Sequence, residues 1–155
     1  MMWRLMSPRR SAMKHRMTAP AFPFTHRFRV RYAELDPQSV VFNSRYLEYA
    51  DLVITEFWRA VGMPFAAEEA LDFHVARATV DFRKPLRADE EVDAHARVSR
   101  FGNSSMTTEI ALHGAGADDL RARIELIHVH VDLGTGRSQP IPEHVRARFA
   151  LHAGA

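Results

Sequence analysis

Residues 31–61 read RYAELDPQSVVFNSRYLEYADLVITEFWRAV. Asp36-Pro37 interrupts any regular pattern, so we predict a loop over residues 33–43. Over residues 44–61 the apolar positions recur at helical spacing and leave only a narrow polar edge. A helix this apolar must be buried on most of its surface, so another part of the chain has to wrap it.

Both ends of this predicted helix carry boundary signals. Asn43 or Ser44 can cap the first turn. Gly62 and Pro64 follow the last turn, where they favour termination.

Period-two alternation of apolar and polar residues predicts five strands in the rest of the chain. They cover residues 25–32, 73–84, 92–99, 106–112 and 120–132. The residues expected to face inward in the first two strands are Phe28, Val30 and Tyr32, and then Ala76, Ala78, Val80 and Phe82.

The last four predicted strands are joined by short connections, which favour antiparallel neighbours. In the final strand the apolar phase changes near Leu126-Ile127, which predicts a bulge or burial on both faces. Pro142 opens a short helix that extends to about Phe149. The economical arrangement is an α+β fold in which a curved antiparallel five-stranded sheet wraps around one long central helix.

Composition excludes several kinds of chemistry. Apolar residues make up 46% of the chain, which is typical of a folded protein, and cysteine is absent. Disulfides, thiolate metal sites and cysteine nucleophiles are therefore excluded, and a reducing, cytoplasmic location is expected. No apolar run approaches the roughly 20 residues of a membrane helix, so we expect no membrane insertion. His128 and His130 lie two apart on one strand, but no third ligand is evident and we expect no metal site.

The first residues form a basic segment that we separate from the folded domain. The first 16 residues contain no acid, and their basic residues are Arg4, Arg9, Arg10, Lys14, His15 and Arg16. Such a tail can bind nucleic acid or anionic lipid. Several methionines offer alternative starts, however, and no apolar stretch typical of a signal peptide follows. We therefore assign residues 1–22 to a disordered tail and residues 23–150 to one domain, and expect no nucleic-acid partner.

Asp36 is the most informative acid in the chain. It lies in a loop a few residues before the start of a buried helix, whose free N–H groups and positive dipole end can stabilise an oxyanion. A carboxylate beside that point can attack a carbonyl or activate water. These parts suffice for acyl transfer without a metal or a cofactor.

Two sequence blocks resemble a known family. The first has Asp36, two variable residues, a small residue at Ser39, the pair Val40-Val41 and then Tyr46; the second covers residues 80–90. This pattern resembles the 4-hydroxybenzoyl-CoA thioesterase group of hotdog-fold proteins, including the short acyl-CoA thioesterases found beside bacterial Tol–Pal genes. The resemblance extends over residues 24–149.

The resemblance implies a mechanism and an assembly. Asp36 would be the nucleophile or general base, and the backbone N–H near Asn43 would polarise the thioester carbonyl. The active site would lie between two subunits of a homodimer or homotetramer. The resemblance also supplies candidate substrate-binding residues, which are Ser39, Val41, Phe42 and Tyr46 around the acyl group and Arg83, Lys84, Arg87, Arg100, Asn103 and Ser104 near the CoA phosphates.

Several alternatives remain open from the sequence. The family usually has Gly where this chain has Ser39, which favours a second hypothesis of a non-catalytic acyl-CoA or acyl-carrier-protein binding module. A hotdog hydratase or dehydratase is another, although no His occupies the Asp36 motif. Glu48 and Glu56 on the predicted helix are alternative bases. The preferred acyl group cannot be read from the sequence.

Overall fold

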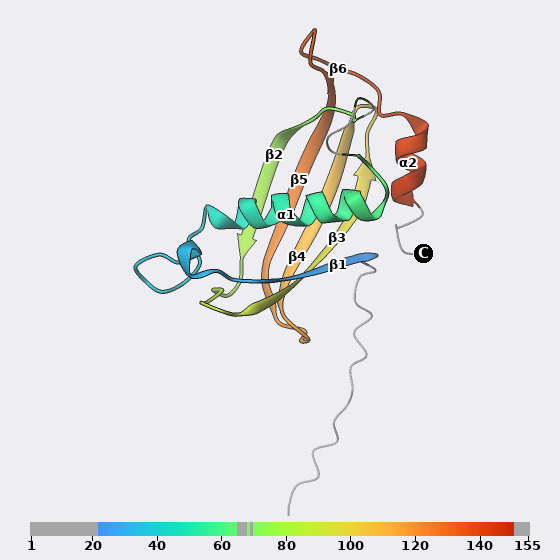
Figure 1. Cartoon of the computed structure of the whole chain (residues 1–155). Helices are drawn as coiled ribbons and strands as arrows, with labels where there is room; N and C mark the ends of the chain where they lie inside the picture. The colour runs from blue at the N-terminus through green and yellow to red at the C-terminus, as the bar shows by residue number, and fades with distance from the viewer. Residues whose placement is uncertain (1–21, 65–67, 69, 151–155) are drawn as a thin grey trace, which may run out of the picture.

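The structure is a computed structural model that describes residues 22–64, 68 and 70–150. The predicted basic tail therefore lies, apart from Phe22, outside the described residues. The described part contains one curved antiparallel sheet with a helix packed across one of its faces (Figure 1). Its elements are β1 Phe24–Arg29, η1 Tyr32–Glu34, α1 Arg45–Ala60, β2 Phe73–Phe82, β3 Glu91–Phe101, β4 Ser105–Gly114, β5 Leu120–Asp132, β6 Arg137–Ser138 and α2 Glu143–Ala150.

Helix α1 buries one side against the sheet, whereas the sequence predicted burial of most of its surface: Leu47 is 44% exposed and Leu52 is 37% exposed. The buried side chains of α1 are Tyr46, Tyr49, Ala50, Val53, Ile54, Phe57 and Trp58. They share one hydrophobic core with inward residues of β3, β4 and β5, such as Ala94, Ile110 and Ile124. The Phe57 ring packs between Phe24 of β1 and Phe149 of α2, with ring centroids 5.2 and 5.5 Å away.

The strand count and the strand order differ from the sequence-based prediction. The sheet has six strands rather than five, because the two-residue β6 pairs with β5 and is too short to show alternation. The order is β1-β3-β4-β5-β2. The short connection between β2 and β3 had suggested that these two strands pair, but β2 pairs with β5 instead. Residues 83–90 can make this crossing, because a connection of that length reaches about 26 Å, whereas three strand spacings amount to about 14 Å.

Strand β1 ends at Arg29, earlier than predicted. The Val30 N–H donates to the Glu90 carbonyl, and the chain then turns into η1. Tyr32, which we expected to face inward, is consequently 88% exposed.

Strand β2 was expected to bury every second residue, but it does not. Ala76, Ala78 and Phe82 are exposed, because β2 forms an edge of the sheet. The irregularity predicted near residue 126 lies in β2, where the register shifts between Val75 and Arg77. Strand β5 buries its even-numbered residues from Ala122 to His130; on its other face Ile127 and Val129 are half-buried and Val131 is buried, so burial on both faces occurs only near the end of the strand.

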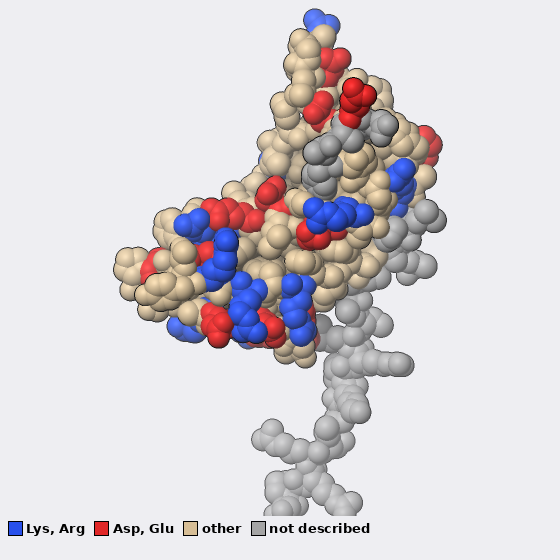
Figure 2. Space-filling view, in the orientation of Figure 1, with Lys and Arg blue, Asp and Glu red and all other residues tan. Residues whose placement is uncertain are grey.

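Opposite charges interleave over β1 on the face shown in Figure 2. Arg27 pairs with Asp93 at 2.7 Å, and Arg29 pairs with Glu91 at 2.9 Å. This pattern is typical of a solvated face rather than of a basic nucleic-acid surface.

Candidate active site

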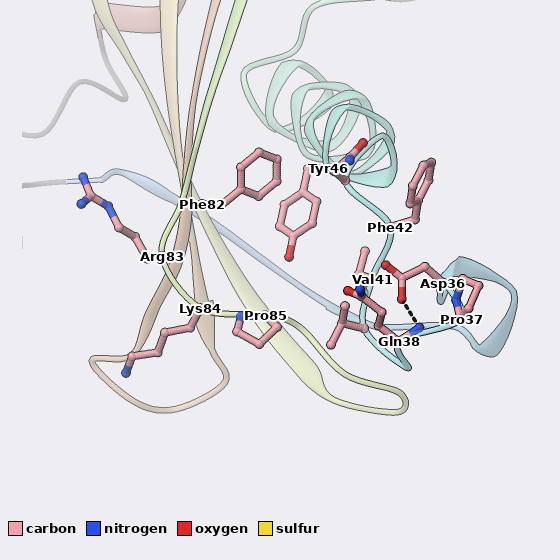
Figure 3. A pocket seen from close by; sticks show the side chains of 12 residues that line it. Asp36, Pro37, Gln38, Val41, Phe42, Tyr46, Phe82, Arg83, Lys84 and Pro85 are labelled. Atoms are coloured by element: carbon pink, nitrogen blue, oxygen red, sulfur yellow. Dashed lines mark hydrogen bonds between the residues drawn. The ribbon is translucent and has the colours of Figure 1, made fainter.

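A tight turn presents Asp36 beside the start of α1. The Asp36 N–H donates to the Val40 carbonyl at 2.8 Å, and the Ser39 N–H donates to the Asp36 carbonyl at 2.9 Å. Oδ1 of Asp36 accepts the Gln38 N–H at 2.7 Å, which fixes the carboxylate (Figure 3). Its other oxygen accepts no hydrogen bond from the described residues and can face a substrate.

Ser39 takes a backbone conformation that favours glycine. Its φ is 62°, in the left-handed region where a side chain costs about 1 kcal/mol or more. This is the position at which the family resemblance predicted Gly. The turn therefore keeps the glycine-like geometry although this chain has Ser.

Glu34, two residues before Asp36, is a buried acid that the sequence did not single out. It is 3% exposed, and its Oε2 accepts hydrogen bonds from the Tyr49 hydroxyl at 2.6 Å and the Arg31 N–H at 2.8 Å. Its Oε1 accepts from Arg31 Nε at 2.7 Å. Burial alone would raise the pKa of Glu34, but the hydrogen bonds from Tyr49 and Arg31 outweigh burial and hold the pKa below its ordinary value. Burial and the bond to Glu34 also raise the pKa of Tyr49. The sequence carries no clear signal for this role, because Arg31 cannot form the side-chain half of a capping box and the bond from Tyr49 spans 15 residues.

A cavity of about 630 Å³ opens beside this turn. Its lining residues are Asp36, Pro37, Gln38, Val40, Val41, Phe42, Asn43, Tyr46, Phe82, Arg83, Lys84 and Pro85. The structure thus brings most of the predicted site residues to one hollow, although they come from the loop, from α1 and from the end of β2.

The two alternative bases on α1 lie outside this cavity. Neither Glu48 nor Glu56 is among the lining residues. Glu48 pairs with Arg45, and Glu56 pairs with Arg59, so both acids belong to the polar edge of the helix. The geometry therefore favours Asp36 over either of them.

Asn43 lines this cavity just before the start of α1. Neither the Asn43 N–H nor the Ser44 N–H donates to another of the described residues, and the Ser44 side chain makes no capping bond. The predicted side-chain cap at Ser44 is therefore absent. Unused N–H groups at the start of α1 can bind an oxygen that carries negative charge.

Tyr46 and Phe82 form an aromatic wall of the cavity. Their rings meet edge-on with centroids 4.9 Å apart (Figure 3). Tyr46 is 3% exposed, whereas Phe82 is 54% exposed. Burial raises the pKa of Tyr46, so its hydroxyl stays protonated.

The predicted phosphate-binding residues divide into two groups. Arg83 and Lys84 lie at the cavity rim and point away from Asp36 (Figure 3), and Lys84 is paired with Asp119 at 2.8 Å. Arg87 bridges to Val40 but is not part of the lining. The remaining three, Arg100, Asn103 and Ser104, lie at the β3–β4 turn, at the end of the sheet where β2 begins. The single chain does not bring this group to the cavity.

Neither a metal site nor a membrane helix is found in the described part of the chain. Residues 22–64, 68 and 70–150 contain no group of three or more His, Asp or Glu side chains that could hold a metal ion. His128 and His130 are both buried in the sheet, and His130 is hydrogen-bonded to the Pro140 carbonyl. No helix among the described residues is long and apolar enough to span a bilayer.

Comparison with known proteins identifies the family. A model of the thioesterase-like superfamily matches residues 30–149. The chain belongs to this superfamily. This result confirms the family that the two sequence blocks predicted.

Several solved structures have a similar fold. A thioesterase from Thermus thermophilus, solved with coenzyme A and zinc, is 30% identical, with a TM-score of 0.75 over 87% of this chain and 98% of that one. A hypothetical protein from Aquifex aeolicus is 25% identical, with a TM-score of 0.75 over 82% of this chain and 99% of that one. A 1,4-dihydroxy-2-naphthoyl-CoA thioesterase from Synechocystis is 16% identical, with a TM-score of 0.74 over 82% of this chain and 95% of that one, and shows the fold alone.

Proposed function

We propose that this superfamily member hydrolyses an acyl-CoA thioester to a free acid and CoA. The observation that carries the proposal is that Asp36 and Asn43 line one cavity and that the Asn43 N–H donates to none of the described residues. A carboxylate and an oxyanion donor are the two groups that hydrolysis of an already activated thioester requires. The Thermus thermophilus relative, which was solved with coenzyme A, supports CoA as the carrier.

In this proposal Asp36 acts on the thioester carbonyl either as a nucleophile or as a general base. As a nucleophile, its free oxygen attacks the carbonyl carbon, the C–S bond breaks, CoA leaves as the thiolate, and water hydrolyses the resulting anhydride. As a general base, it takes a proton from a water that attacks the same carbon; the C–S bond then breaks, CoA leaves as the thiolate, and the proton passes to it to give the thiol. In both routes the carbonyl oxygen gains negative charge and accepts a hydrogen bond from the Asn43 N–H.

The working unit in this proposal is a homodimer formed through β2. Val75 is 55% exposed and Phe82 is 54% exposed on this edge strand, and a free apolar edge is a template for pairing with another strand. An antiparallel β2 pair follows twofold symmetry and reverses the second copy end to end. The β3–β4 turn of the second copy, with its Arg100 and Asn103, then comes toward the cavity of the first. The residues at the partner's β3–β4 turn would then lie near Arg83 and Lys84 of the first copy, so that both groups of predicted phosphate-binding residues surround one cavity.

Thiol release from purified protein tests the proposed activity. The panel should include short, branched, long-chain and aromatic acyl-CoAs, with coenzyme A binding measured in parallel by calorimetry. We expect thiol release from at least one class. Coenzyme A binding without thiol release from any class would contradict the proposal and favour the binding-module hypothesis.

A further inference from the structure

We infer that Glu34 is a positioning residue that holds Asp36 and the Asn43 N–H in their relative places. The inference rests on the proposed function above. Glu34 does not line the cavity, so any effect it has on catalysis must pass through neighbouring groups.

The carboxylate of Glu34 joins the Asp36 loop to α1. The Tyr49 hydroxyl, one turn after Tyr46 in α1, donates to it at 2.6 Å. Arg31 donates from both its backbone and its side chain. Tyr49 is itself fixed, because its ring packs against Phe28 of β1 with centroids 4.7 Å apart. The loop is thereby tied to the core and not only to its own backbone.

The backbone of Glu34 fixes the other half of the site. Its carbonyl accepts the Phe42 N–H at 3.0 Å, and Leu35 bridges to Val41. Phe42 directly precedes Asn43, so this bond anchors the chain immediately before the N–H that donates to none of the described residues. Asp36 lies two residues after Glu34, between these two attachments.

Packing alone does not explain a buried carboxylate at position 34. Burying a charge is unfavourable unless donors compensate it, and an apolar side chain of similar volume would pack more favourably. Glu34 instead has three hydrogen-bond donors aimed at it in fixed directions. Such directional bonds restrict the loop to one position relative to α1, which is what a reaction sensitive to about 1 Å requires.

Glu34→Gln tests this role, because glutamine keeps the shape but cannot accept from all three donors. We expect kcat to fall about 10- to 100-fold with KM nearly unchanged, since the cavity lining is retained. Tyr49→Phe should give a smaller fall in kcat. Adding it to Glu34→Gln should lower kcat little further, because both changes break the same link. Glu48→Gln is the matched control: it removes an exposed carboxylate at the same end of α1, outside the cavity lining, and should leave kcat unchanged.

A second readout does not depend on activity. Amide hydrogen exchange should accelerate over residues 36–43 in Glu34→Gln and stay unchanged in β4, since only the loop is released. An unchanged kcat together with a uniform rise in exchange would overturn the inference, because Glu34 would then serve general stability only. If wild type hydrolyses no acyl-CoA, the proposed function fails, whereas the exchange comparison still decides whether Glu34 holds the loop.

Discussion

Asp36 and Asn43 line the same cavity, although a tight turn separates them in the chain. The turn makes this possible by reversing direction between Asp36 and Val40. The acid is thereby held by the loop, and the donor is held by the start of α1.

Replacing Ser39 with Gly should stabilise the protein. Ser39 has a φ of 62°, which glycine adopts freely, so Ser39→Gly should raise the free energy of unfolding by about 1 kcal/mol. Urea denaturation monitored by tryptophan fluorescence measures the change. Ser44→Gly is the matched control, because Ser44 has helical dihedral angles and gains nothing from the substitution. An equal gain in both variants would show that the left-handed backbone is not the cause.

Stability should decrease as the pH falls below about 6.5. Burial lowers the pKa of His128 in the folded state, so the unfolded chain binds its proton at a higher pH. Between the folded and unfolded pKa values, this group lowers stability by about 1.4 kcal/mol for each pH unit. The hydrogen bond from Arg27 lowers the pKa of Asp93 to about 2, so Asp93 changes the pH dependence of stability only in a separate and more acidic range.

Denaturation curves at pH 7.5, 6.5 and 5.5 test this dependence in wild type and in His128→Gln. The variant should show a smaller loss of stability between pH 6.5 and 5.5. His95, whose pKa is lowered by burial and by His113, should account for part of the loss that remains. Identical slopes in both proteins would contradict a neutral buried His128.

In the proposed dimer Val75 lies in the interface, so substituting it should affect assembly more than its exposure in one chain suggests. Val75→Lys places a charge on the apolar edge of β2 and should shift the protein from dimer to monomer. Light scattering coupled to gel filtration measures the mass. Leu133→Lys is the control, since Leu133 is also exposed but lies outside every strand. A dimer that survives Val75→Lys would show that β2 is not the interface.

Arg83 and Lys84 should differ in their effect on CoA binding. Arg83 has no ion pair with the described residues, whereas Lys84 is held by Asp119. We expect Arg83→Ala to raise KM about tenfold at low salt and Lys84→Ala to raise it less. The difference should shrink with dephospho-CoA thioesters if Arg83 contacts the 3′-phosphate. An Arg83→Ala enzyme with wild-type KM would exclude that contact.

The sequence predicts the family, the antiparallel sheet and the segment of α1 because each depends on local periodicity or on a local motif. It predicts the strand order wrongly for β2, since pairing with β5 depends on contacts across the whole sheet. The exposure of β2 was missed for the same reason: alternation shows which side chains share a face, but not whether anything covers that face.

The candidate site divides in the same way. The Asp36 motif and its helix start are close in sequence and were predicted. Glu34 was missed because its inferred role depends on a hydrogen bond from Tyr49, which lies 15 residues away in the chain. The separation of Arg100 and Asn103 from the cavity within one chain follows from the length of β3, which the strand predicted over residues 92–99 already approximates.

Single-turnover thiol release by Asp36→Asn, compared with wild type and Asp51→Asn, tests the central proposal most directly. Asparagine keeps the shape of Asp36 and its acceptor for the Gln38 N–H, but it can neither attack a carbonyl nor take a proton. Asp51 is an exposed acid of α1 outside the cavity lining and controls for the loss of a negative charge. Our account predicts that Asp36→Asn lowers the rate at least about 100-fold while Asp51→Asn retains it. Wild-type rates in Asp36→Asn would contradict the account and move catalysis to another group.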